Sequence, residues 1–556
     1  MRGDDVENGA VMRTIVDALR HHAAHTPERV ALRTMDGAII TWRELAARAE
    51  TVARALVASG VRPGDRVAVL AKNSLVWPLA DLGTLCAGAI SVGLYPTSSP
   101  EQVAVVLNDC GARVLIVDDD TQLEKVRAVR ASVPALATVV AWGGAGDGAV
   151  TWDAWLQTRD VTLPAPPAPD DDAVLIYTSG STGVPKGARI SHACLVATAE
   201  SIRGVLGFTS DDTSMSFLPF CHAGERMFGH ATRVWIGIEA MLVDDVASVF
   251  AVASSYHPTI YGGLPRVFEK AYEAMRAAEQ GAASPDDARE RVEAARLAHF
   301  GARVRRVTSG GAALPVAVAE YLDAHGVRVL GAYGQTEHLC VAMHRPAQYN
   351  FTSVGLPMPG TEWRIADDGE VLIRRSALTF SGYWQRDDET RDAFTDDGAW
   401  LQTGDLGSVD ADGFLTITGR KKELIALSSG KKVAPLPIEA ALSNGPWIEH
   451  AVLFGEGRHF ISALFTLRGE TLRAWAAGAG VRGAADALQA HDAVRAAVQA
   501  QVDAVNATLS RPEQVKRWVL SPTPFTVETG ELTPTLKLKR RDVTQRYAAL
   551  MAPLYD

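Results

Sequence analysis

The segment 177–187 contains the residue types that a phosphate-binding loop needs. It reads Tyr-Thr-Ser-Gly-Ser-Thr-Gly-Val-Pro-Lys-Gly, with three glycines, four hydroxyl side chains after the tyrosine and one lysine, Lys186. Glycines expose backbone N–H groups that can surround a polyphosphate, and Lys186 adds a positive charge. A flexible Gly-Ser turn is the common alternative, but a linker has no use for the rigid Val-Pro-Lys. We therefore interpret the segment as a phosphate loop.

The residues on either side of this lysine disfavour the loop of P-loop NTPases. The Walker pattern has glycine before the lysine and serine or threonine after it. Here Pro185 precedes Lys186 and Gly187 follows it. The segment therefore indicates a different class of polyphosphate loop.

Two further glycine-rich segments, 307–315 and 331–337, could hold the rest of a nucleotide. The first reads Val-Thr-Ser-Gly-Gly-Ala-Ala-Leu-Pro and the second reads Gly-Ala-Tyr-Gly-Gln-Thr-Glu. Their glycines would let a flat ring approach the backbone. The tyrosine, threonine and glutamate of the second could stack on a base, bond to a phosphate oxygen and hold Mg²⁺. Alone, either segment is only a sheet edge with a turn, but with segment 177–187 they predict a nucleotide site.

Asp405 and Arg420 are candidates for a sugar site. They lie in the segments 401–407, Leu-Gln-Thr-Gly-Asp-Leu-Gly, and 419–423, Gly-Arg-Lys-Lys-Glu. A carboxylate at a tight turn could accept hydrogen bonds from both ribose hydroxyls, and the arginine could reach the same sugar. An isolated Thr-Gly-Asp turn is usually structural.

Lys537 belongs to the basic run 533–541, Thr-Pro-Thr-Leu-Lys-Leu-Lys-Arg-Arg. Such a run is most often a solvated face. Pro534 and Thr535 instead favour a lysine that projects from a fixed turn. The segment 428–432, Ser-Ser-Gly-Lys-Lys, is a second loop built from serine, glycine and lysine.

Three polar residues interrupt the apolar segment 217–229, which reads Phe-Leu-Pro-Phe-Cys-His-Ala-Gly-Glu-Arg-Met-Phe-Gly. They are His222, Glu225 and Arg226. A helix start with a satisfied ion pair and a direct catalytic role are about equally compatible with this pattern.

Helices and strands alternate along residues 41–131. The pattern predicts a helix that begins at Thr41 and is ended by Gly60 and Pro63, and further helices at 77–88, 100–109 and 121–131. Strands are predicted at 67–71, 89–94 and 113–117. This spacing predicts right-handed crossovers and a parallel sheet, that is, an α/β fold. We expect a buried strand at 173–176 before the phosphate loop and a helix from Ile190 after it. Two solvated helices are expected within 271–303 and further helix within 470–509.

Length and composition restrict the class of protein. A chain of 556 residues should form at least two domains. Its net charge of −10 gives no basic field for nucleic acid. The five cysteines are scattered, which disfavours a metal or disulfide framework and fits a reducing compartment. The N-terminus lacks a signal-peptide core, and the apolar window 77–95 contains Asp81, so we expect a cytoplasmic protein without an integral membrane segment.

In order and spacing, these segments resemble those of the adenylate-forming superfamily, over residues 26–541. The chain is most similar to its long-chain fatty acyl-CoA synthetases, through Leu-Pro-x-x-His-x-x-Glu-Arg at 218–226 and Pro-Arg-Val-Phe-Glu-Lys at 265–270. The resemblance implies a large N-terminal domain, 1–421, with stacked mixed or parallel sheets flanked by helices. It also implies a small mobile α+β C-terminal domain, 422–556, joined by a hinge at Lys422.

The resemblance implies an acyl-CoA synthetase that uses ATP, Mg²⁺ and CoA. Such an enzyme joins a fatty or bulky hydrophobic acid to ATP, releases pyrophosphate, and passes the acyl group from acyl-AMP to CoA. Three alternatives stay open: an enzyme for only one half-reaction, acyl transfer to a carrier protein, and a non-catalytic nucleotide-binding protein. The last is disfavoured because mere AMP binding needs none of Lys186, Glu337 and Lys537. A homodimer and an acyl-carrier or pathway partner also stay open.

Each residue that matches a motif of the superfamily receives a role from the resemblance. The catalytic residues would be Lys537, Thr336, Glu337 and Lys186. The β and γ phosphates would be held by Thr178, Ser179, Gly180, Ser181, Thr182, Gly183 and Lys186. The rest of the nucleotide would be held by Gly311, Ala312, Ala332 and Tyr333 at adenine, Thr336 and Lys537 at the α-phosphate, and Asp405 and Arg420 at the ribose. Mg²⁺ would be held by Thr178 and Glu337, the acyl pocket would include His222, Gly262, Gly263 and Leu264, and the CoA side would include Ser428, Ser429, Gly430, Lys431 and Lys432.

Overall fold

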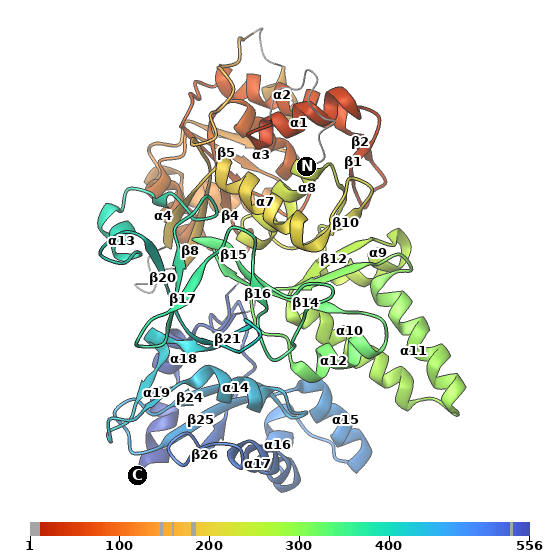
Figure 1. The fold of residues 1–556 in the computed structure, drawn as a ribbon, viewed down its shortest axis with the longest axis vertical. Coiled ribbons are helices and arrows are strands. Elements are labelled where there is room, and N and C mark those ends of the chain that lie inside the picture. The colour runs from red at the N-terminus through yellow and green to blue at the C-terminus, as the bar shows by residue number, and fades with distance from the viewer. Residues whose placement is uncertain (1–11, 145–147, 158–160, 180–184, 534–536) are drawn as a thin grey trace. The chain divides into compact units, whose positions relative to one another are not determined.

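The computed structural model describes residues 12–144, 148–157, 161–179, 185–533 and 537–556. The chain divides into two compact units: Met1–Trp363 with Ile373–Gln402, and Arg364–Leu372 with Thr403–Asp556 (Figure 1). Each unit encloses hydrophobic cores of its own. The two units confirm the expected α/β fold with a large N-terminal part and a separate C-terminal part.

The first unit contains an eight-stranded sheet with a parallel centre. In spatial order its strands are β19 (Gly382–Tyr383), β9 (Pro185–Ser191), β8 (Asp172–Ser179), β4 (Ile90–Leu94), β3 (Arg66–Leu70), β5 (Val114–Val117), β6 (Thr138–Ala141) and β7 (Val150–Thr151). All neighbours from β8 to β7 pair in parallel, whereas β8 with β9 and β9 with β19 pair antiparallel. The parallel sheet predicted from the alternating pattern is confirmed.

Helices cover both faces of this sheet because successive side chains of a strand point to opposite faces. Val67 and Val69 pack in one core with α2 (Trp42–Ala58) and α3 (Val76–Cys86). Ala68 and Leu70 pack in another with α4 (Pro100–Cys110) and α5 (Asp120–Val129). The fully apolar run of β3 is therefore what a strand covered on both faces needs.

A nine-stranded sheet forms the rest of the strand framework in the first unit. In spatial order its strands are β16 (Leu356–Pro357), β15 (His338–Met343), β14 (Val329–Gln335), β13 (Arg306–Ser309), β12 (Ile260–Gly263), β10 (Thr213–Ser216), β11 (Glu239–Leu242), β1 (Val30–Arg33) and β2 (Ile39–Thr41). The run from β14 to β1 is parallel. Both segments predicted to flank a nucleotide, 307–315 and 331–337, overlap the carboxyl ends of parallel strands, where open α/β sheets bind ligands.

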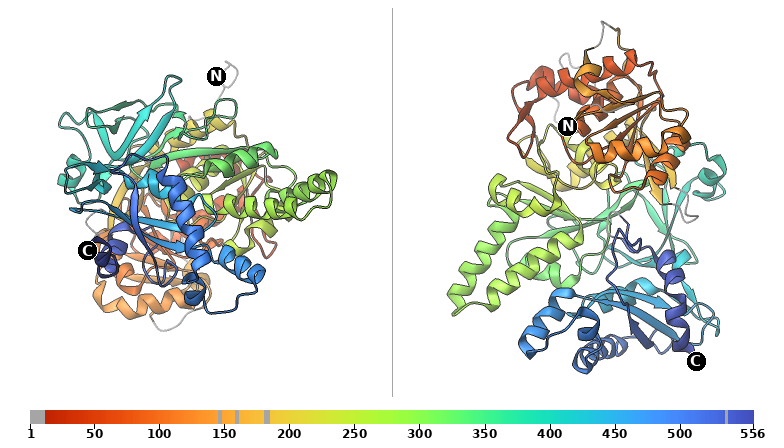
Figure 2. Two further views of the ribbon diagram at one scale, coloured as in Figure 1. Left: turned by 90° about the horizontal axis from the view of Figure 1, so that it is seen from below. Right: turned by 180° about the vertical axis from the view of Figure 1, so that it is seen from behind.

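The remaining helices of the first unit connect and cover these strands. They are α1 (Ile15–His25), α6 (Trp152–Leu156), α7 (His192–Leu206), a π-helix (Gly224–Ala231), α8 (Thr232–Ile236), α9 (Val249–Tyr256), α10 (Pro265–Gln280), α11 (Pro285–Phe300), α12 (Val316–Ala324) and α13 (Asp387–Asp392). Figures 1 and 2 show α10 and α11 side by side as a pair that extends outward from the strands. This pair confirms the prediction of two helices with a break between them.

The second unit contains a three-stranded sheet of β24 (Ile448–Phe454), β25 (Ile461–Leu467) and β26 (Val515–Leu520). Its first face packs in one core with α14 (Pro435–Ser443), α15 (Gly469–Ala479) and α17 (Asp492–Asn506). Its other face packs in a second core with α18 (Arg540–Arg546) and α19 (Ala548–Met551). Helices α15 and α17, with α16 (Ala485–Gln489) between them, confirm the predicted helix within 470–509.

Shorter strands precede this sheet. A four-stranded sheet of β17 (Trp363–Ile365), β18 (Glu370–Arg374), β20 (Trp400–Val409) and β21 (Leu415–Arg420) includes the positions at which the chain passes between the units. The strands β22 (Ile425–Ala426) and β23 (Lys432–Val433) form a small hairpin.

Two local expectations are wrong. Ile190 is not the start of a helix: it lies in β9, which returns antiparallel to β8, and the helix begins at His192 after the N-cap Ser191. Asp405 is not in a turn but inside β20, where Gly404 with φ +70° bends the strand locally. In both cases pairing with the neighbouring strand of a hairpin decided the conformation, which the pattern of the segment alone does not contain.

None of the helices in the part of the chain that the structure describes has the length and apolar character that crossing a membrane requires.

Candidate active site

The predicted phosphate loop connects β8 to β9 as a hairpin. Thr178 pairs with Lys186 across this hairpin, and Ser179 pairs with Pro185. The predicted ligands Gly180, Ser181, Thr182 and Gly183 lie outside the described residues. After the lysine, a Cβ at Gly187 would lie 3.1 Å from the ring of Tyr177, so a glycine leaves room for the tyrosine that precedes the loop.

Lys186 and Glu337 both contact Tyr383. The Lys186 ammonium lies 5.3 Å from the centroid of the Tyr383 ring and also forms an ion pair with Glu389. The Tyr383 hydroxyl donates a hydrogen bond of 2.5 Å to Glu337 Oε1. The structure therefore brings together the lysine and the glutamate that the sequence singled out, although 150 positions separate them.

Neither Tyr383 nor Glu389 was predicted from the sequence. Burial raises the pKa of Tyr383, and the Glu337 carboxylate raises it further. Its hydroxyl therefore stays protonated and donates to Glu337. Lys186 lowers the pKa of Glu389, so this carboxylate stays ionised. The segment 382–389 contains no glycine cluster or spaced ligand pair, so only tertiary structure shows that it faces the hairpin.

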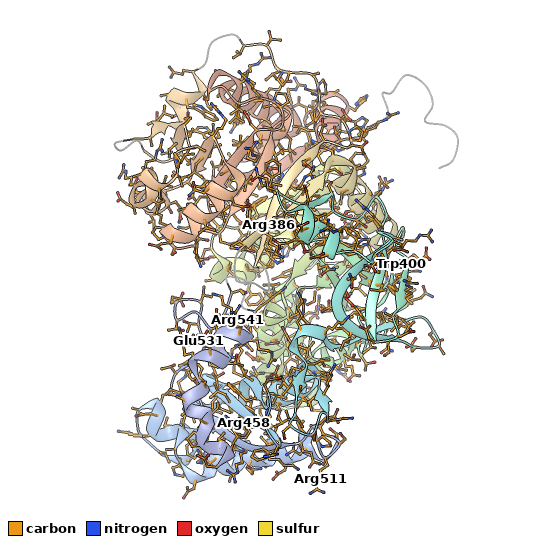
Figure 3. All side chains as sticks on the ribbon, turned by 90° about the vertical axis from the view of Figure 1, so that its left-hand side faces the viewer. Arg386, Trp400, Arg458, Arg511, Glu531 and Arg541 are labelled. Atoms are coloured by element: carbon orange, nitrogen blue, oxygen red, sulfur yellow. The ribbon has the colours of Figure 1, made fainter. Side chains whose placement is uncertain are left out.

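A second set of contacts fixes the base of the hairpin. The Tyr177 hydroxyl donates to Asp109 Oδ2 at 2.6 Å, and Arg386 donates to Asp109 Oδ1 at 2.9 Å. Arg386, labelled in Figure 3, also lies 3.4 Å from Glu389 Oε1. One arginine thus connects the residue before the loop to the ion pair of Lys186, which restricts the position of that lysine.

The predicted adenine and acyl residues lie at the ends of adjacent strands. Gly263 of β12 pairs with Ser309 of β13, and Ser309 pairs with Gly331 of β14. A Cβ at Gly310 would lie 3.5 Å from the Ala332 carbonyl oxygen, so the backbones beyond the paired residues approach closely. The ends of β13 and β14 carry the adenine candidates Gly311, Ala312, Ala332 and Tyr333, and the end of β12 carries the acyl candidates Gly262, Gly263 and Leu264.

Thr336 and Glu337 form the turn of the hairpin between β14 and β15. Gln335 pairs with His338 on either side of them. At Gly334 a Cβ would lie 1.5 Å from the Leu339 carbonyl oxygen, so only glycine fits. This close pairing places the Thr336 and Glu337 side chains at the tip of a short turn.

The interrupted segment 217–229 is held by buried ion pairs with partners elsewhere in the chain. Arg226 pairs with Asp81 of α3, and His230 Nε2 lies 3.2 Å from Asp81 Oδ2. Glu225 forms a separate pair of 2.5 Å with Arg233. The expected ion pair therefore exists, but Glu225 and Arg226 have different partners.

His222 lies just before the π-helix. Its Nδ1 accepts a hydrogen bond of 3.1 Å from the Gly224 N–H, which fixes the orientation of the ring. A π-helix is rare and often marks a functional position. Of the three polar residues, Glu225 and Arg226 are buried with their partners, whereas His222 is half-buried.

In the second unit, Asp405 and Arg420 face each other across β20 and β21. Arg420 Nε lies 3.2 Å from Asp405 Oδ1. Asp405 is buried, with only 2% of the residue exposed to solvent. Lys537 is exposed to solvent. Desolvation of its ammonium group by the surrounding protein nevertheless lowers its pKa, and the positive charge of Arg420 lowers the pKa further. The negative charge of Asp405 opposes this shift. Both predicted ribose residues therefore lie within electrostatic range of the Lys537 ammonium.

The predicted hinge and CoA residues are exposed. Lys422 lies in a 3-10 turn, Lys421–Glu423, directly after β21. The hairpin between β22 and β23 has Ser428, Ser429, Gly430 and Lys431 in its connecting turn and Lys432 as the first residue of β23. Gly430 has φ +80°, which favours glycine, and the Ser428 hydroxyl lies 2.8 Å from His459 Nδ1.

Glycine turns at the ends of neighbouring parallel strands, next to a lysine-bearing hairpin, are typical of a nucleotide-binding α/β enzyme. Comparison with known proteins agrees. Residues 19–384 match the model of the AMP-binding enzymes, and residues 422–556 match that of the AMP-binding enzyme C-terminal domain. The chain belongs to the AMP-binding enzyme family, which confirms the resemblance to the adenylate-forming superfamily.

Individual relatives support the same assignment. The chain is 34% identical to the long-chain-fatty-acid–CoA ligase FadD15 of Mycobacterium bovis, over 96% of each chain. Its fold is similar to that of the anthranilate CoA ligase AuaEII in complex with anthranoyl-AMP, with a TM-score of 0.81, 24% identity, and coverage of 98% of this chain and 99% of that one. It is also similar to the adenylation domain of a carboxylate reductase from Mycobacterium chelonae, with a TM-score of 0.82, 24% identity, and coverage of 99% and 92%.

Proposed function

We propose that this chain is an AMP-forming acyl-CoA synthetase. It joins a carboxylic acid to ATP to give acyl-AMP and pyrophosphate, and then transfers the acyl group to the thiol of CoA. The observation that carries the proposal is the contact of both Lys186 and Glu337 with Tyr383 in a member of the AMP-binding enzyme family. Relatives named long-chain-fatty-acid–CoA ligases favour a fatty acid as substrate.

The roles follow from the charges that the first half-reaction brings together. A carboxylate attacks an α-phosphate, so two anions approach and negative charge builds in the transition state. Lys186 holds the terminal phosphates, and Thr336 donates to the α-phosphate. Lys537 bridges the substrate carboxylate and the α-phosphate. No general base is needed, because a carboxylate is already ionised at neutral pH.

The donor set at Glu337 fits Mg²⁺, which prefers oxygen ligands and commonly binds through one or two carboxylates together with substrate phosphates. One oxygen of Glu337 accepts from Tyr383, which leaves the other for the ion. Thr178 and Glu337 are the residues that would hold it. Among the described residues, no cluster of three or more His, Cys, Asp or Glu side chains forms a metal site, consistent with an ion held mainly by phosphates. When bound, the ion neutralises phosphate charge.

The second half-reaction needs Lys537 withdrawn and the CoA thiol admitted. We propose that rotation of the C-terminal domain, 422–556, about Lys422 makes this exchange, with the segment 428–432 on the CoA side. His222, Gly262, Gly263 and Leu264 contribute to the acyl pocket. Adenine lies against Gly311, Ala312, Ala332 and Tyr333, and the ribose binds Asp405 and Arg420.

A panel of acids of increasing chain length tests this function. The purified protein, ATP, Mg²⁺ and each acid are assayed for pyrophosphate, and CoA thioester is measured in parallel reactions with CoA. We expect pyrophosphate and thioester with long-chain acids. Pyrophosphate without thioester would indicate another acyl acceptor, such as a carrier protein. Absence of pyrophosphate with every acid would contradict the proposal.

The substitution Tyr383→Phe tests the link between Lys186 and Glu337. Phenylalanine keeps a ring beside Lys186 but removes the hydrogen bond to Glu337. A hydrogen bond to a charged group contributes about 1.5–3 kcal/mol, so we expect acyl-AMP formation to fall at least about tenfold. Pyrophosphate release is measured over a range of Mg²⁺ concentrations. Tyr349→Phe, which removes a hydroxyl that contacts Asp323 instead, is the matched control. Equal rates for the two variants would rule out the assigned role of Tyr383.

A further inference from the structure

Lys537 lies on a short hairpin whose backbone is closed by its own hydrogen bonds. The Thr533 N–H donates to the Lys537 carbonyl at 2.8 Å, and the Lys537 N–H donates to Thr533 Oγ1 at 3.0 Å. Further out, the Lys539 N–H donates to the Glu531 carbonyl at 2.8 Å. The position of the lysine therefore depends on what anchors this hairpin to the rest of the second unit.

The arginine that follows the hairpin, Arg540, supplies such an anchor. It is the first residue of α18, its side chain is 16% exposed, and it lies between two carboxylates. Arg540 Nη2 forms an ion pair with Glu439 of α14, whose other oxygen accepts the Leu453 N–H of β24 at 2.6 Å. Arg540 Nε lies 3.5 Å from Glu423 Oε2. One guanidinium thus joins the hairpin to the core and to the residue after Lys422.

The same spacing occurs in the two segments that this arginine joins. Arg420 and Glu423 are three positions apart, as are Lys537 and Arg540. Arg420 and Asp405 are the charged groups that act on the Lys537 ammonium, and Glu423 contacts Arg540. The segment around the hinge candidate and the segment that carries the lysine therefore meet at two points. The attraction between Glu423 and Arg540 holds the second segment against the first.

We propose that Arg540 is a positioning residue for Lys537, because it fixes the lysine hairpin to Glu423 beside the hinge candidate Lys422. This inference rests on the proposed function and deepens it. With the link intact, the hairpin and the first turn after the hinge move as one piece, so Lys537 reaches the α-phosphate in the adenylation half-reaction. Thioester formation takes place with Lys537 withdrawn and does not depend on this link.

Two substitutions break the link from opposite ends and keep the buried charge of Glu439 paired. Arg540→Lys retains a positive charge beside Glu439 but lacks the planar fork that reaches two carboxylates. Glu423→Gln removes the charge beside the hinge and leaves the pair of Arg540 with Glu439 intact. The neighbouring Arg541 is exposed, and Figure 3 labels it on the same unit, so Arg541→Lys is the matched control.

The experiment measures the two half-reactions separately in the full-length protein. Pyrophosphate release from ATP and acid reports adenylation, and CoA thioester formed from supplied acyl-AMP reports the second step. We expect Arg540→Lys and Glu423→Gln each to slow adenylation about tenfold, because each removes the ion pair between Arg540 and Glu423, and to leave the second step unchanged. The double variant should be no slower than the slower single variant, because both break one link. Arg541→Lys should behave as the wild type.

Three results would overturn the inference: adenylation at the wild-type rate in both single variants, equal loss of both half-reactions, or multiplied losses in the double variant. Each of these three results can be interpreted only if the wild type releases pyrophosphate. A wild type that releases none with any acid would overturn the proposed function itself, and the inference with it.

Discussion

Lys537→Ala should abolish acyl-AMP formation and leave thioester formation from supplied acyl-AMP close to the wild-type rate. The proposed mechanism uses this lysine in the adenylation half-reaction and withdraws it for thioester formation. Its ammonium interacts electrostatically with Arg420 and Asp405, the residues proposed to bind the ribose next to the α-phosphate. Removing one charge that stabilises a transition state commonly costs about 10² to 10³ in rate. We expect a loss of at least that size in pyrophosphate release.

The control for this substitution is Lys516→Ala, which removes an exposed lysine of the same unit. Both variants should keep the wild-type unfolding temperature, because Lys537 is itself exposed. The informative quantity is the ratio of the two half-reaction rates. If Lys537→Ala slowed both half-reactions to the same extent, the lysine would not be specific to adenylation and its assignment would be wrong.

The local sequence pattern was sufficient to predict much of the fold. Thr41 was expected to begin a helix, and it caps α2 by accepting the Glu44 N–H while the Glu44 side chain accepts from the cap. The strands of the parallel sheet were found because each is a short apolar run between a helix end and a turn. Such signals are contained in a few consecutive residues, so they can be recognised without knowing which other elements pack against the segment.

Contacts between distant segments could not be predicted in the same way. Lys186 and Glu337 were each recognised from a glycine-rich motif, but Tyr383 and Glu389, which connect them, lie in a segment without such a motif. The helix expected at Ile190 is a strand because the segment pairs with the strand directly before it. Residues 185–191 pair with β8 along their whole length, and this pairing outweighs their weak local preference.

The buried pair of Asp81 and Arg226 gives the largest expected effect on stability. Asp81 was interpreted only as a reason against a membrane span, and Arg226 as a member of a local ion pair. In the structure their side chains are 1% and 6% exposed, and His230 contacts the same carboxylate. Breaking a buried pair by removing one partner costs roughly 3–5 kcal/mol, because the other charge stays buried without compensation. Asp81→Asn should therefore lower the unfolding temperature by several degrees.

An exposed pair in the same unit is the matched control. Arg29 and Asp211 lie 3.0 Å apart, with side chains 42% and 86% exposed. Surface pairs of this kind contribute about 0–1 kcal/mol, so Asp211→Asn should change the unfolding temperature little. Asp81→Asn combined with Arg226→Met should be more stable than Asp81→Asn alone, since methionine removes the unpaired charge and keeps most of the volume. Equal unfolding temperatures for Asp81→Asn and Asp211→Asn would contradict this account.

The pH dependence of the unfolding temperature of Asp81→Asn distinguishes an effect of the Asp81 charge from an effect of side-chain packing. Burial alone would raise the pKa of Asp81, but Arg226 and His230 outweigh it and hold the pKa well below its usual value of 3.8. A carboxyl whose pKa is lower in the folded than in the unfolded state stabilises the fold when the pH is above the unfolded-state pKa. This contribution is lost as the pH falls from the unfolded-state pKa through the folded-state pKa. The difference in unfolding temperature between wild type and Asp81→Asn should therefore be constant from pH 7 to about pH 5 and narrow below about pH 4. If Asp81 acted only by filling space, the difference would not change with pH.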